Sequence, residues 1–288
     1  MVNLYLSLIK FSHTVFALPF ALIGFYLAYI TYQPNDFFYK FFLVLLAMIF
    51  ARSTAMAFNR YIDREIDAQN PRTKNREIPA GKISPEAAKR FITFNGMAFI
   101  VTTYFINEIC FLLSPIALAV VLGYSYTKRF TWLCHYVLGL GLALAPVGAY
   151  LTISGKFDVI TILMGCSVFL WVGGFDIIYA LQDETFDKSN NLKSIPSKFG
   201  VKKSIIISRV SHFFSALFLS IALILMRNQF PEVGNLSIVG LIIFILLLIR
   251  QHWLVNEHNL ANINQAFFES NGMASLLFGT LIIIDLFY

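Results

Sequence analysis

The sequence predicts an all-α membrane protein, a bundle of nine transmembrane helices with a polar cytoplasmic cap over a central cavity. Three observations predict this class. Hydrophobic residues make up 58% of the 288 positions and only 13% are charged, about half the share that is usual in a soluble domain. Apolar runs of roughly 17 to 25 residues, the length that crosses a bilayer, recur along the chain. Basic residues gather in alternate connections between these runs.

Nine apolar runs account for most of the chain, which we interpret as a single domain over residues 1–288. In order, the runs cover residues 11–32, 40–59, 88–107, 109–127, 132–152, 159–181, 203–226, 235–254 and 266–287. The first run follows Lys10 and resembles a signal peptide, but it stays apolar for too long and has no small-x-small cleavage site. The second run ends at Asn59 in a polar stretch, and the sixth contains Asp176.

The basic residues predict how these spans are oriented. With nine spans, the N-terminus shares one side of the membrane with every second loop. That side holds all of the 22 Lys and Arg residues except Lys40, Lys156 and Arg227. The positive-inside rule therefore predicts a multi-pass protein of the cell inner (cytoplasmic) membrane with a cytoplasmic N-terminus. The net charge of +6 then reflects topology and attraction to anionic lipid headgroups, and no basic run interleaved with aromatic residues indicates nucleic acid as a partner.

One polar stretch interrupts this apolar chain, AFNRYIDREIDAQNPRTKNREIPAG at residues 57–81. Asn59, Asp63 and Asp67 are four residues apart, a spacing that places three oxygen-bearing side chains along one face of a helix. Carboxylate and amide oxygens are hard ligands, which suit Mg²⁺ and poorly suit zinc or copper. The stretch is therefore a candidate metal site at the end of a span.

A second stretch, residues 176–199, repeats this pattern as DIIYALQDETFDKSNNLKSIPSKF. Asp183 and Asp187 have the same DxxxD spacing 120 residues after the first pair, and Tyr179 stands in the place of Asn59. Four spans separate the copies, and an even number of spans returns the chain to the same membrane face. We predict a parallel internal repeat that places two acid clusters opposite each other in the bundle.

Asp176 lies seven residues before Asp183 and hence two helical turns deeper in its span. A charge inside an apolar span costs about 2.5–3.5 kcal/mol on insertion scales, so this carboxylate needs a partner or a function. A single DxxxD at a helix end would be an ordinary solvated surface feature. Two matched copies with a deeper carboxylate beside one of them indicate a functional site.

Basic residues follow each acid cluster. They are Arg72, Lys74, Arg76 and Lys82 after the first, and Lys188, Lys193 and Lys198 after the second. Carboxylates alone would bind a metal and cations alone would bind phosphate, so the combination predicts a Mg²⁺–diphosphate site. Tyr124 and Lys128, one turn apart at the end of the fourth span, could reach the same diphosphate, although the pair taken alone is better explained as the ordinary flank of a span.

These residues resemble the motifs of the UbiA-type intramembrane prenyltransferases. NRYIDREID resembles the first acid motif, RTKNREIPAG the loop after it, YSYTKRFT the Tyr–Lys segment, and YALQDETFDKSNNLKS the second acid motif. The four parts occur in order over most of the chain, and the likeness is greatest for the 4-hydroxybenzoate polyprenyltransferase group, including menaquinone-pathway relatives. Arg60 departs from the usual Asp after the Asn, and Glu77 takes the place often held by Pro.

The resemblance implies Mg²⁺-dependent transfer of a polyprenyl group from polyprenyl diphosphate to an aromatic acid, 4-hydroxybenzoate or a naphthoate, in ubiquinone or menaquinone biosynthesis. It implies one metal cluster at Asn59, Asp63 and Asp67 and another at Asp183 and Asp187. It also implies an acceptor-handling role for Asp176. The diphosphate contacts that it implies are Arg72, Arg76, Tyr124, Lys128 and Lys193. Lys10 and His13, at the cytoplasmic start of the first span, are predicted to meet the acceptor's carboxylate, although an interfacial histidine explains His13 equally well.

Two alternatives remain open at this point. One is a haem O synthase-like or lipid prenyltransferase of the same superfamily. The other, from a different class, is a cation-coupled membrane transporter, which predicts acids near the bilayer midplane in broken helices. Most of the acids here lie instead at span ends beside basic loops, and this favours the prenyltransferase. The sequence indicates neither an oligomeric state nor the length of the prenyl chain.

Overall fold

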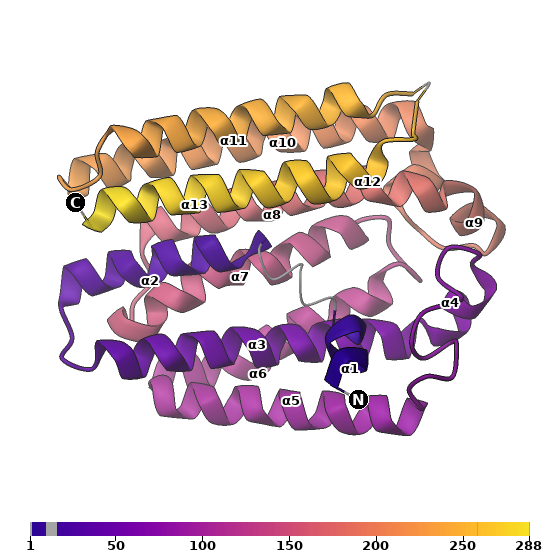
Figure 1. Ribbon diagram of the computed structural model, residues 1–288, viewed down its shortest axis with the longest axis horizontal. Coiled ribbons are helices and arrows are strands. Elements are labelled where there is room, and N and C mark those ends of the chain that lie inside the picture. The colour runs from indigo at the N-terminus through magenta and orange to yellow at the C-terminus, as the bar shows by residue number, and fades with distance from the viewer. Residues whose placement is uncertain (1, 10–15, 258, 288) are drawn as a thin grey trace. The chain divides into compact units, whose positions relative to one another are not determined.

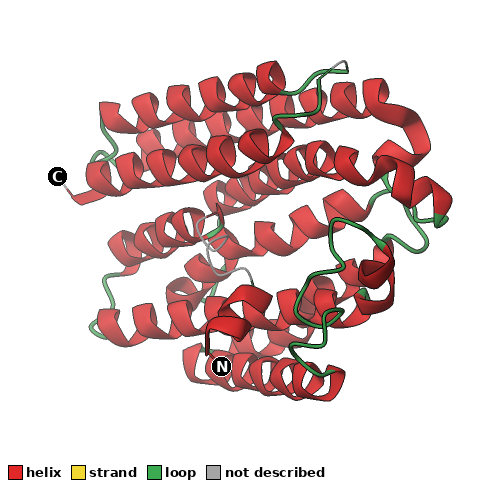
Figure 2. Ribbon diagram, turned by 45° about the vertical axis from the view of Figure 1, so that its right-hand side comes forward, coloured by secondary structure: helices red, strands yellow, loops and turns green. Residues whose placement is uncertain are grey.

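The computed structural model describes residues 2–9, 16–257 and 259–287. Within these ranges the regular structure is helical, and Figure 2 shows no strand. The chain forms two compact units, one of Met1–Thr14 and Asp36–Tyr126 and the other of Val15–Asn35 and Thr127–Tyr288. Figure 1 labels the helices of both units. The predicted single domain with an internal repeat stays a prediction.

The first unit is built on the packing of α3 (Phe37–Ile62) against α5 (Pro85–Ile106). Two short helices, α1 (Val2–Leu8) and α4 (Arg64–Gln69), contact α3, and α6 (Glu108–Thr127) follows α5.

A small apolar core ties the polar connection after α4 to these helices. It consists of Leu8, Ala57, Ile78, Ile83 and Ala88. At the end of this connection Ser84 caps α5, because its side chain accepts a hydrogen bond from the Ala87 N–H. The second half of the loop that carries several predicted phosphate-binding cations is thus fixed to these helices.

The second unit is centred on α8 (Val159–Ala180), of which 14 residues are buried. Its other long helices are α2 (Leu18–Tyr32), α7 (Cys134–Ser154), α10 (Ile195–Gln229), α11 (Asn235–Leu254) and α13 (Asn271–Phe287). Helix α8 packs between α7 and α10, α7 packs on α2, and α13 packs on both α11 and α2. The short elements are η2 (Leu181–Asp183), α9 (Glu184–Ser189), α12 (Ile263–Gln265) and a π-helical turn, η3 (Ala266–Ser270).

The core of the second unit is aromatic. Trp171 of α8 is fully buried and contacts Phe20, Phe175 and Phe244, with ring centres 5.3–5.6 Å apart. The indole N–H of Trp171 donates to Asn271 Oδ1 at 2.8 Å, which satisfies the polar atom of a large buried side chain. These contacts join α8 to α2, α11 and α13.

Glycine permits the close approach of α7 and α8. A Cβ at Gly139 of α7 would collide with the carbonyl oxygen of Phe169 in α8, whereas a Cβ at Gly148 of the same helix would meet nothing within 4 Å. Small residues at such crossings are typical of membrane helix pairs.

Each of the nine predicted spans contains one long helix, although the count of nine transmembrane helices is not confirmed. Among the described residues, seven helical segments are long and apolar enough to cross a membrane. The other two long helices are α2, which has only 15 residues, and α5, whose first turns carry Glu86, Lys89 and Arg90.

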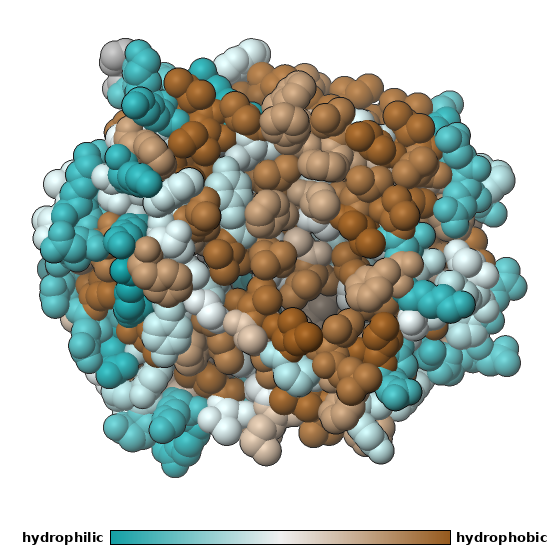
Figure 3. Space-filling view, turned by 180° about the vertical axis from the view of Figure 1, so that it is seen from behind, coloured by the Kyte–Doolittle hydropathy of each residue, from teal (hydrophilic) through white to brown (hydrophobic). Residues whose placement is uncertain are grey.

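The surface of the helices is suited to lipid. Large apolar side chains are exposed on both units, such as Phe94 and Leu112 on the first and Phe213 and Leu246 on the second. On the face shown in Figure 3, hydrophobic side chains cover the middle and hydrophilic ones gather toward two edges. An apolar band between polar ends is the distribution that a bilayer selects.

Helix α10 begins earlier than the predicted span 203–226. A capping box between Ser194 and Ser197 starts it at Ile195, with Pro196 in the first turn. Gly200 then adopts φ 75° and ψ 172°, so a break separates the first turns from the membrane portion. The sequence pattern found only the part after this break.

Candidate functional site

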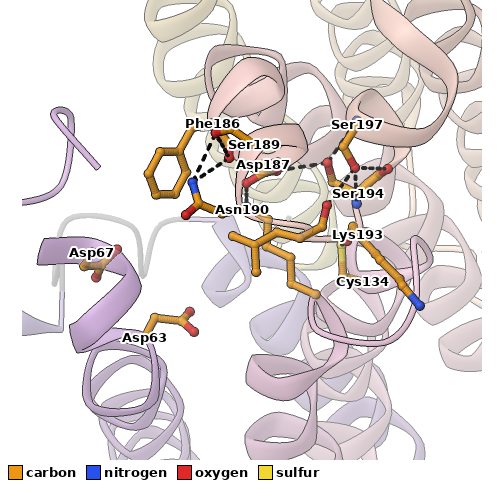
Figure 4. A network of polar contacts seen from close by, with 12 residues as sticks. Asp63, Asp67, Cys134, Phe186, Asp187, Ser189, Asn190, Lys193, Ser194 and Ser197 are labelled. Carbon is orange, nitrogen blue, oxygen red and sulfur yellow. Dashed lines mark hydrogen bonds and ion pairs between the residues drawn. The ribbon is translucent and has the colours of Figure 1, made fainter. Parts of the chain in front are cut away.

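The first acid cluster lies where α3 ends. The predicted continuous helix is interrupted, because Asp63 has φ −90° and ψ 4° between Ile62, the last residue of α3, and Arg64, the first of α4. Backbone hydrogen bonds still run from Asp63 N–H to the Asn59 carbonyl at 3.0 Å and from Asp67 N–H to the Asp63 carbonyl at 2.7 Å. The three predicted ligands therefore occupy successive turns, and Figure 4 shows Asp63 and Asp67 on this segment.

The side chains of this cluster already have partners. The Asn59 amide donates from Nδ2 to Asp63 Oδ2 at 3.1 Å. Arg76, a cation predicted to bind diphosphate, donates to both carboxylate oxygens of Asp67 at 2.7 and 2.8 Å. Asp67 is only 5% exposed, and a buried carboxylate requires such a partner. A predicted metal ligand and a predicted phosphate ligand are thus bound to each other.

The connection between α4 and α5 is held by its own polar groups. Thr73 donates from its hydroxyl to the carbonyl of Asp67 at 3.0 Å, and the N–H of Arg72 donates to Asn70 Oδ1 at 2.9 Å. Asn70 and Thr73 are buried, whereas Arg72 is exposed. The structure therefore places Arg72 and Arg76 on one braced loop directly after the acids.

The two departures from the family motif interact with each other. Arg60 and Glu77 are 6% and 9% exposed, and they interact electrostatically; Arg60 also interacts with Asp67 and Arg76. Glu77 accepts a further hydrogen bond from the Ser7 hydroxyl of α1. Asp67 makes the larger favourable interaction with the buried cation of Arg60, and Glu77 adds a smaller one.

The second acid cluster repeats the arrangement of the first. Asp183 and Asp187 lie in η2 and α9 and are 7% and 0% exposed. Lys128 Nζ lies 2.8 Å from Asp187 Oδ1, and the Ser194 hydroxyl donates to Asp187 Oδ2 at 2.9 Å; Figure 4 shows Asp187 facing Ser194. Burial lowers the pKa of Lys128, but the Asp187 carboxylate outweighs this effect and raises that pKa above its ordinary value. Here too the buried acid is bound to a cation predicted for the diphosphate.

A basic cleft of about 630 Å³ lies beside Asp187. Its lining includes Lys193, Lys198, Phe130 and Trp132. The backbone N–H of Lys193 donates to the Lys128 carbonyl at 2.7 Å, which joins the two connections that form the cleft. Lys198 Nζ lies 4.6 Å from the centre of the Trp132 ring, a cation–π contact. The cleft thus offers ammonium groups on an aromatic wall.

Asp176 has a partner that the sequence analysis did not identify. His135, near the start of α7, places its Nδ1 2.7 Å from Asp176 Oδ2. Asp176 is partly exposed, whereas Asp183 and Asp187 are buried, so it is the most accessible of the three carboxylates. A lone histidine in an apolar span has no characteristic spacing, and only the packing of α7 against α8 reveals the pair.

Tyr124, a predicted diphosphate contact near the end of α6, interacts electrostatically with Arg52 of α3. The sequence analysis did not single out Arg52 either. It lies seven residues before Asn59, about two turns or roughly 11 Å further along the helix. A cation inside an apolar span is itself a signal of function, and a guanidinium suits a carboxylate ligand.

The predicted acceptor contacts Lys10 and His13 lie outside the described residues, so their role stays a prediction.

The oxygen donors of both clusters fit Mg²⁺ provided that a substrate supplies further ligands. Among the described residues, no three His, Cys, Asp or Glu side chains lie together as a complete metal site. Each cluster instead offers a pair of Asp residues, and Mg²⁺ is usually bound through one or two carboxylates together with water and substrate phosphates. The donor set therefore matches a metal–diphosphate complex rather than a metal held by protein alone.

Known proteins resemble this chain over most of its length. A family model described as the UbiA prenyltransferase family matches residues 17–276. The 4-hydroxybenzoate octaprenyltransferase of Aliivibrio fischeri (strain MJ11) is 27% identical over 234 residues, which cover 81% of this chain and 79% of that protein. The enzyme of the same name from Marinobacter nauticus is 26% identical over 227 residues, 78% of this chain and 75% of that protein.

Two solved structures show the same fold. The apo structure of a UbiA homolog from Aeropyrum pernix K1 has a TM-score of 0.83 and 28% identity, covering 95% of this chain and 98% of that one. A UbiA homolog from Archaeoglobus fulgidus bound to GPP and Mg²⁺ has a TM-score of 0.72 and 20% identity, covering 99% of this chain and 100% of that one.

Proposed function

Because the chain belongs to the UbiA prenyltransferase family, we propose that it transfers a polyprenyl group from polyprenyl diphosphate to an aromatic acid, 4-hydroxybenzoate or a naphthoate, in quinone biosynthesis. The chain is a membrane prenyltransferase. The name shared by its bacterial relatives supports 4-hydroxybenzoate as the acceptor. The GPP and Mg²⁺ bound to the Archaeoglobus protein support a divalent ion and a prenyl diphosphate as ligands.

One observation carries the proposal: in each unit, an acid of the DxxxD motif is bound to a cation predicted for diphosphate. Arg76 holds Asp67 and Lys128 holds Asp187. A diphosphate offers these cations a more highly charged anion than a carboxylate, and a divalent ion offers the carboxylates a more highly charged cation. We propose that each cluster exchanges this internal ion pair for Mg²⁺ and diphosphate when substrate binds.

The residues of the chain have distinct tasks in this reaction. Mg²⁺, held by Asn59, Asp63 and Asp67 and by Asp183 and Asp187, would neutralise charge on the leaving diphosphate. The cations Arg72, Arg76, Lys128 and Lys193, with the Tyr124 hydroxyl, would bind the remaining phosphate oxygens and orient the prenyl C1. The C1–O bond breaks with its electron pair on the diphosphate, a ring carbon of the acceptor bonds to C1, and that carbon loses its proton.

The acceptor requires groups deeper than the metal ligands. Asp176 is partly exposed in α8 and would accept a hydrogen bond from the acceptor's hydroxyl, which makes the ring more electron-rich, or take up a proton as a general base. Arg52 is the cation inside α3 that suits the acceptor's carboxylate, and Lys10 and His13 are further candidates.

We further propose that the protein lies in the cell inner membrane with the site facing the cytoplasm. Lys and Arg residues crowd the connections that carry both acid clusters, and this asymmetry sets orientation in membrane proteins. The orientation gives the site access to water-soluble aromatic acids and to Mg²⁺, while the prenyl chain remains in lipid.

Replacing one acid in each cluster tests the proposed function. Asp63→Ala and Asp183→Ala should each reduce transfer of a labelled prenyl group to 4-hydroxybenzoate to less than about a tenth, because a lost metal ligand removes several kcal/mol of charge stabilisation. Asp36→Ala is the control, since Asp36 is exposed at the other end of α3 and makes no capping hydrogen bond. Retention of activity by both cluster variants would rule out the two-cluster site.

A further inference from the structure

We propose that His135 is a positioning residue for Asp176, holding its carboxylate in one orientation toward the aromatic acceptor. The inference rests on the proposed function, because it assumes that Asp176 handles the acceptor. It concerns a histidine inside an apolar helix, and it makes the acceptor-handling group a pair of side chains rather than a single aspartate.

The two residues are brought together by helix packing. His135 lies in the first turn of α7 and Asp176 in the last two turns of α8, and these helices pack along each other. His135 Nδ1 and Asp176 Oδ2 are 2.7 Å apart, the distance of a short charge-assisted hydrogen bond. The imidazole is 2% exposed and the Asp176 side chain is 23% exposed. One partner is therefore enclosed in protein while the other remains accessible.

The second ring nitrogen of His135 defines the tautomer. The backbone N–H of Ile195, the first residue of α10, donates to His135 Nε2 at 3.3 Å. A nitrogen that accepts this bond carries no proton, so the proton of the neutral imidazole lies on Nδ1 and is donated to Asp176. His135 thus connects the start of α10 to the carboxylate and orients both through one rigid ring.

This arrangement leaves one carboxylate oxygen for the substrate. Asp176 Oδ2 accepts the hydrogen bond from the Nδ1–H of His135, and no other hydrogen bond to Asp176 occurs among the described residues. Oδ1 is then the oxygen that can accept from an acceptor hydroxyl. A second residue that fixes a catalytic carboxylate or imidazole generally acts in this way. It adds no new chemical group to the reaction, but it excludes unproductive orientations of the group that it holds.

Two substitutions separate the two hydrogen bonds of His135. The amide nitrogen of an asparagine is as many bonds from Cβ as Nδ1, so His135→Asn can keep the donor to Asp176 while losing the acceptor for Ile195. The amide oxygen of a glutamine is as many bonds from Cβ as Nε2, so His135→Gln can keep the acceptor for Ile195 while losing the donor to Asp176. Tyr136→Phe is the matched control, because it removes a 2.7 Å hydrogen bond to Ser211 from the next position of α7 and does not touch Asp176.

Steady-state transfer should distinguish these variants when 4-hydroxybenzoate and geranyl diphosphate are varied separately. His135→Gln should lower kcat/KM for the acceptor about 10–100-fold, the usual loss for a partner that orients a functional ligand. Its KM for geranyl diphosphate should stay within about twofold. His135→Asn should recover most of the acceptor kcat/KM, Tyr136→Phe should match the unmodified protein, and Asp176→Asn should show the same selective loss as His135→Gln.

The outcomes separate the two proposals. Equal losses in the Asn and Gln variants, or a Gln variant that loses affinity for both substrates alike, would show that His135 is merely structural. Absence of transfer by the unmodified protein would overturn the proposed function and the positioning role together. Nitrogen-15 NMR supplies a readout that does not depend on turnover. A proton on His135 Nδ1 whose signal shifts in Asp176→Asn supports the pair, and an Nδ1 that carries no proton contradicts it.

Discussion

Replacing Lys128 by methionine should change the affinities for Mg²⁺ and for prenyl diphosphate in opposite directions. Lys128 Nζ lies 2.8 Å from Asp187 Oδ1, and Asp187 is fully buried. We expect a metal ion that binds this carboxylate to displace the ammonium. Lys128→Met removes the competitor for the metal, but it also removes a cation that the diphosphate needs.

The magnitude follows from the geometry of this ion pair. A hydrogen bond to a charged group contributes about 1.5–3 kcal/mol, and each 1.4 kcal/mol is roughly tenfold in affinity. The Lys128 side chain is 33% exposed, so solvent screening places the pair in the lower half of that range, about 1.5–2.2 kcal/mol. We therefore expect Mg²⁺ alone to bind the variant about 10–40-fold more tightly, and a non-reactive thiolo analogue of geranyl diphosphate to bind it more weakly by a similar factor.

Calorimetric titration of the purified protein in detergent would measure both affinities. Lys188→Met is the matched control, because it removes the same charge from the next position after Asp187 but from a lysine that pairs with Glu184. The control should leave the affinity for Mg²⁺ alone unchanged. If Lys128→Met weakened Mg²⁺ and diphosphate binding together, Lys128 would not compete with the metal, and the exchange of partners at Asp187 would be refuted.

Two other predictions concern topology and packing. A reporter that is active only in the cytoplasm should be silent when fused to the C-terminus, because nine spans from a cytoplasmic N-terminus end outside; an active fusion would mean that the number of spans is even. Gly139→Ala should lower the free energy of unfolding in mixed detergent micelles by about 1–3 kcal/mol, the usual effect of overpacking, since its Cβ would collide with the Phe169 carbonyl. Gly148→Ala, on the same helix with open space at its Cβ, should have little effect, and an equal loss in both variants would show that helix contact is not the cause.

The sequence predicted the helices well because a helix that crosses a bilayer requires a long apolar run, which is easily recognised in a sequence. Each predicted span contains one long helix, and the ends that differ are those set by local polar chemistry rather than by hydropathy. The start of α10 at Ile195 depends on a capping box and on the positive φ of Gly200. The break at Asp63 depends on a single backbone conformation, which a DxxxD pattern does not specify.

Candidate site residues could be proposed from the sequence where they are adjacent in it, and not where helix packing brings them together. Spacing and charge alone singled out Asp67 and Asp187 as candidate metal ligands, a role that stays a prediction. They could not indicate that Arg76 and Lys128 would be bound to those acids, because side-chain pairing across loops depends on backbone placement. The pairing of His135 with Asp176 spans 41 residues, and no local pattern encodes a contact between two separate helices.

The cleft beside Asp187 is lined by a tryptophan whose fluorescence should respond to what the cleft binds. The chain has three tryptophans, and they occupy three different environments. Trp171 is fully buried among aromatic rings, Trp253 is 79% exposed, and Trp132 lines the cleft beneath Lys198. An ammonium over an indole ring alters the fluorescence of that ring, so an anion that draws Lys198 away would change the emission of Trp132 while leaving the signal of Trp171 unaffected. Binding of an anion in this cleft can therefore be followed by the intrinsic fluorescence of the unlabelled protein, before any product has formed.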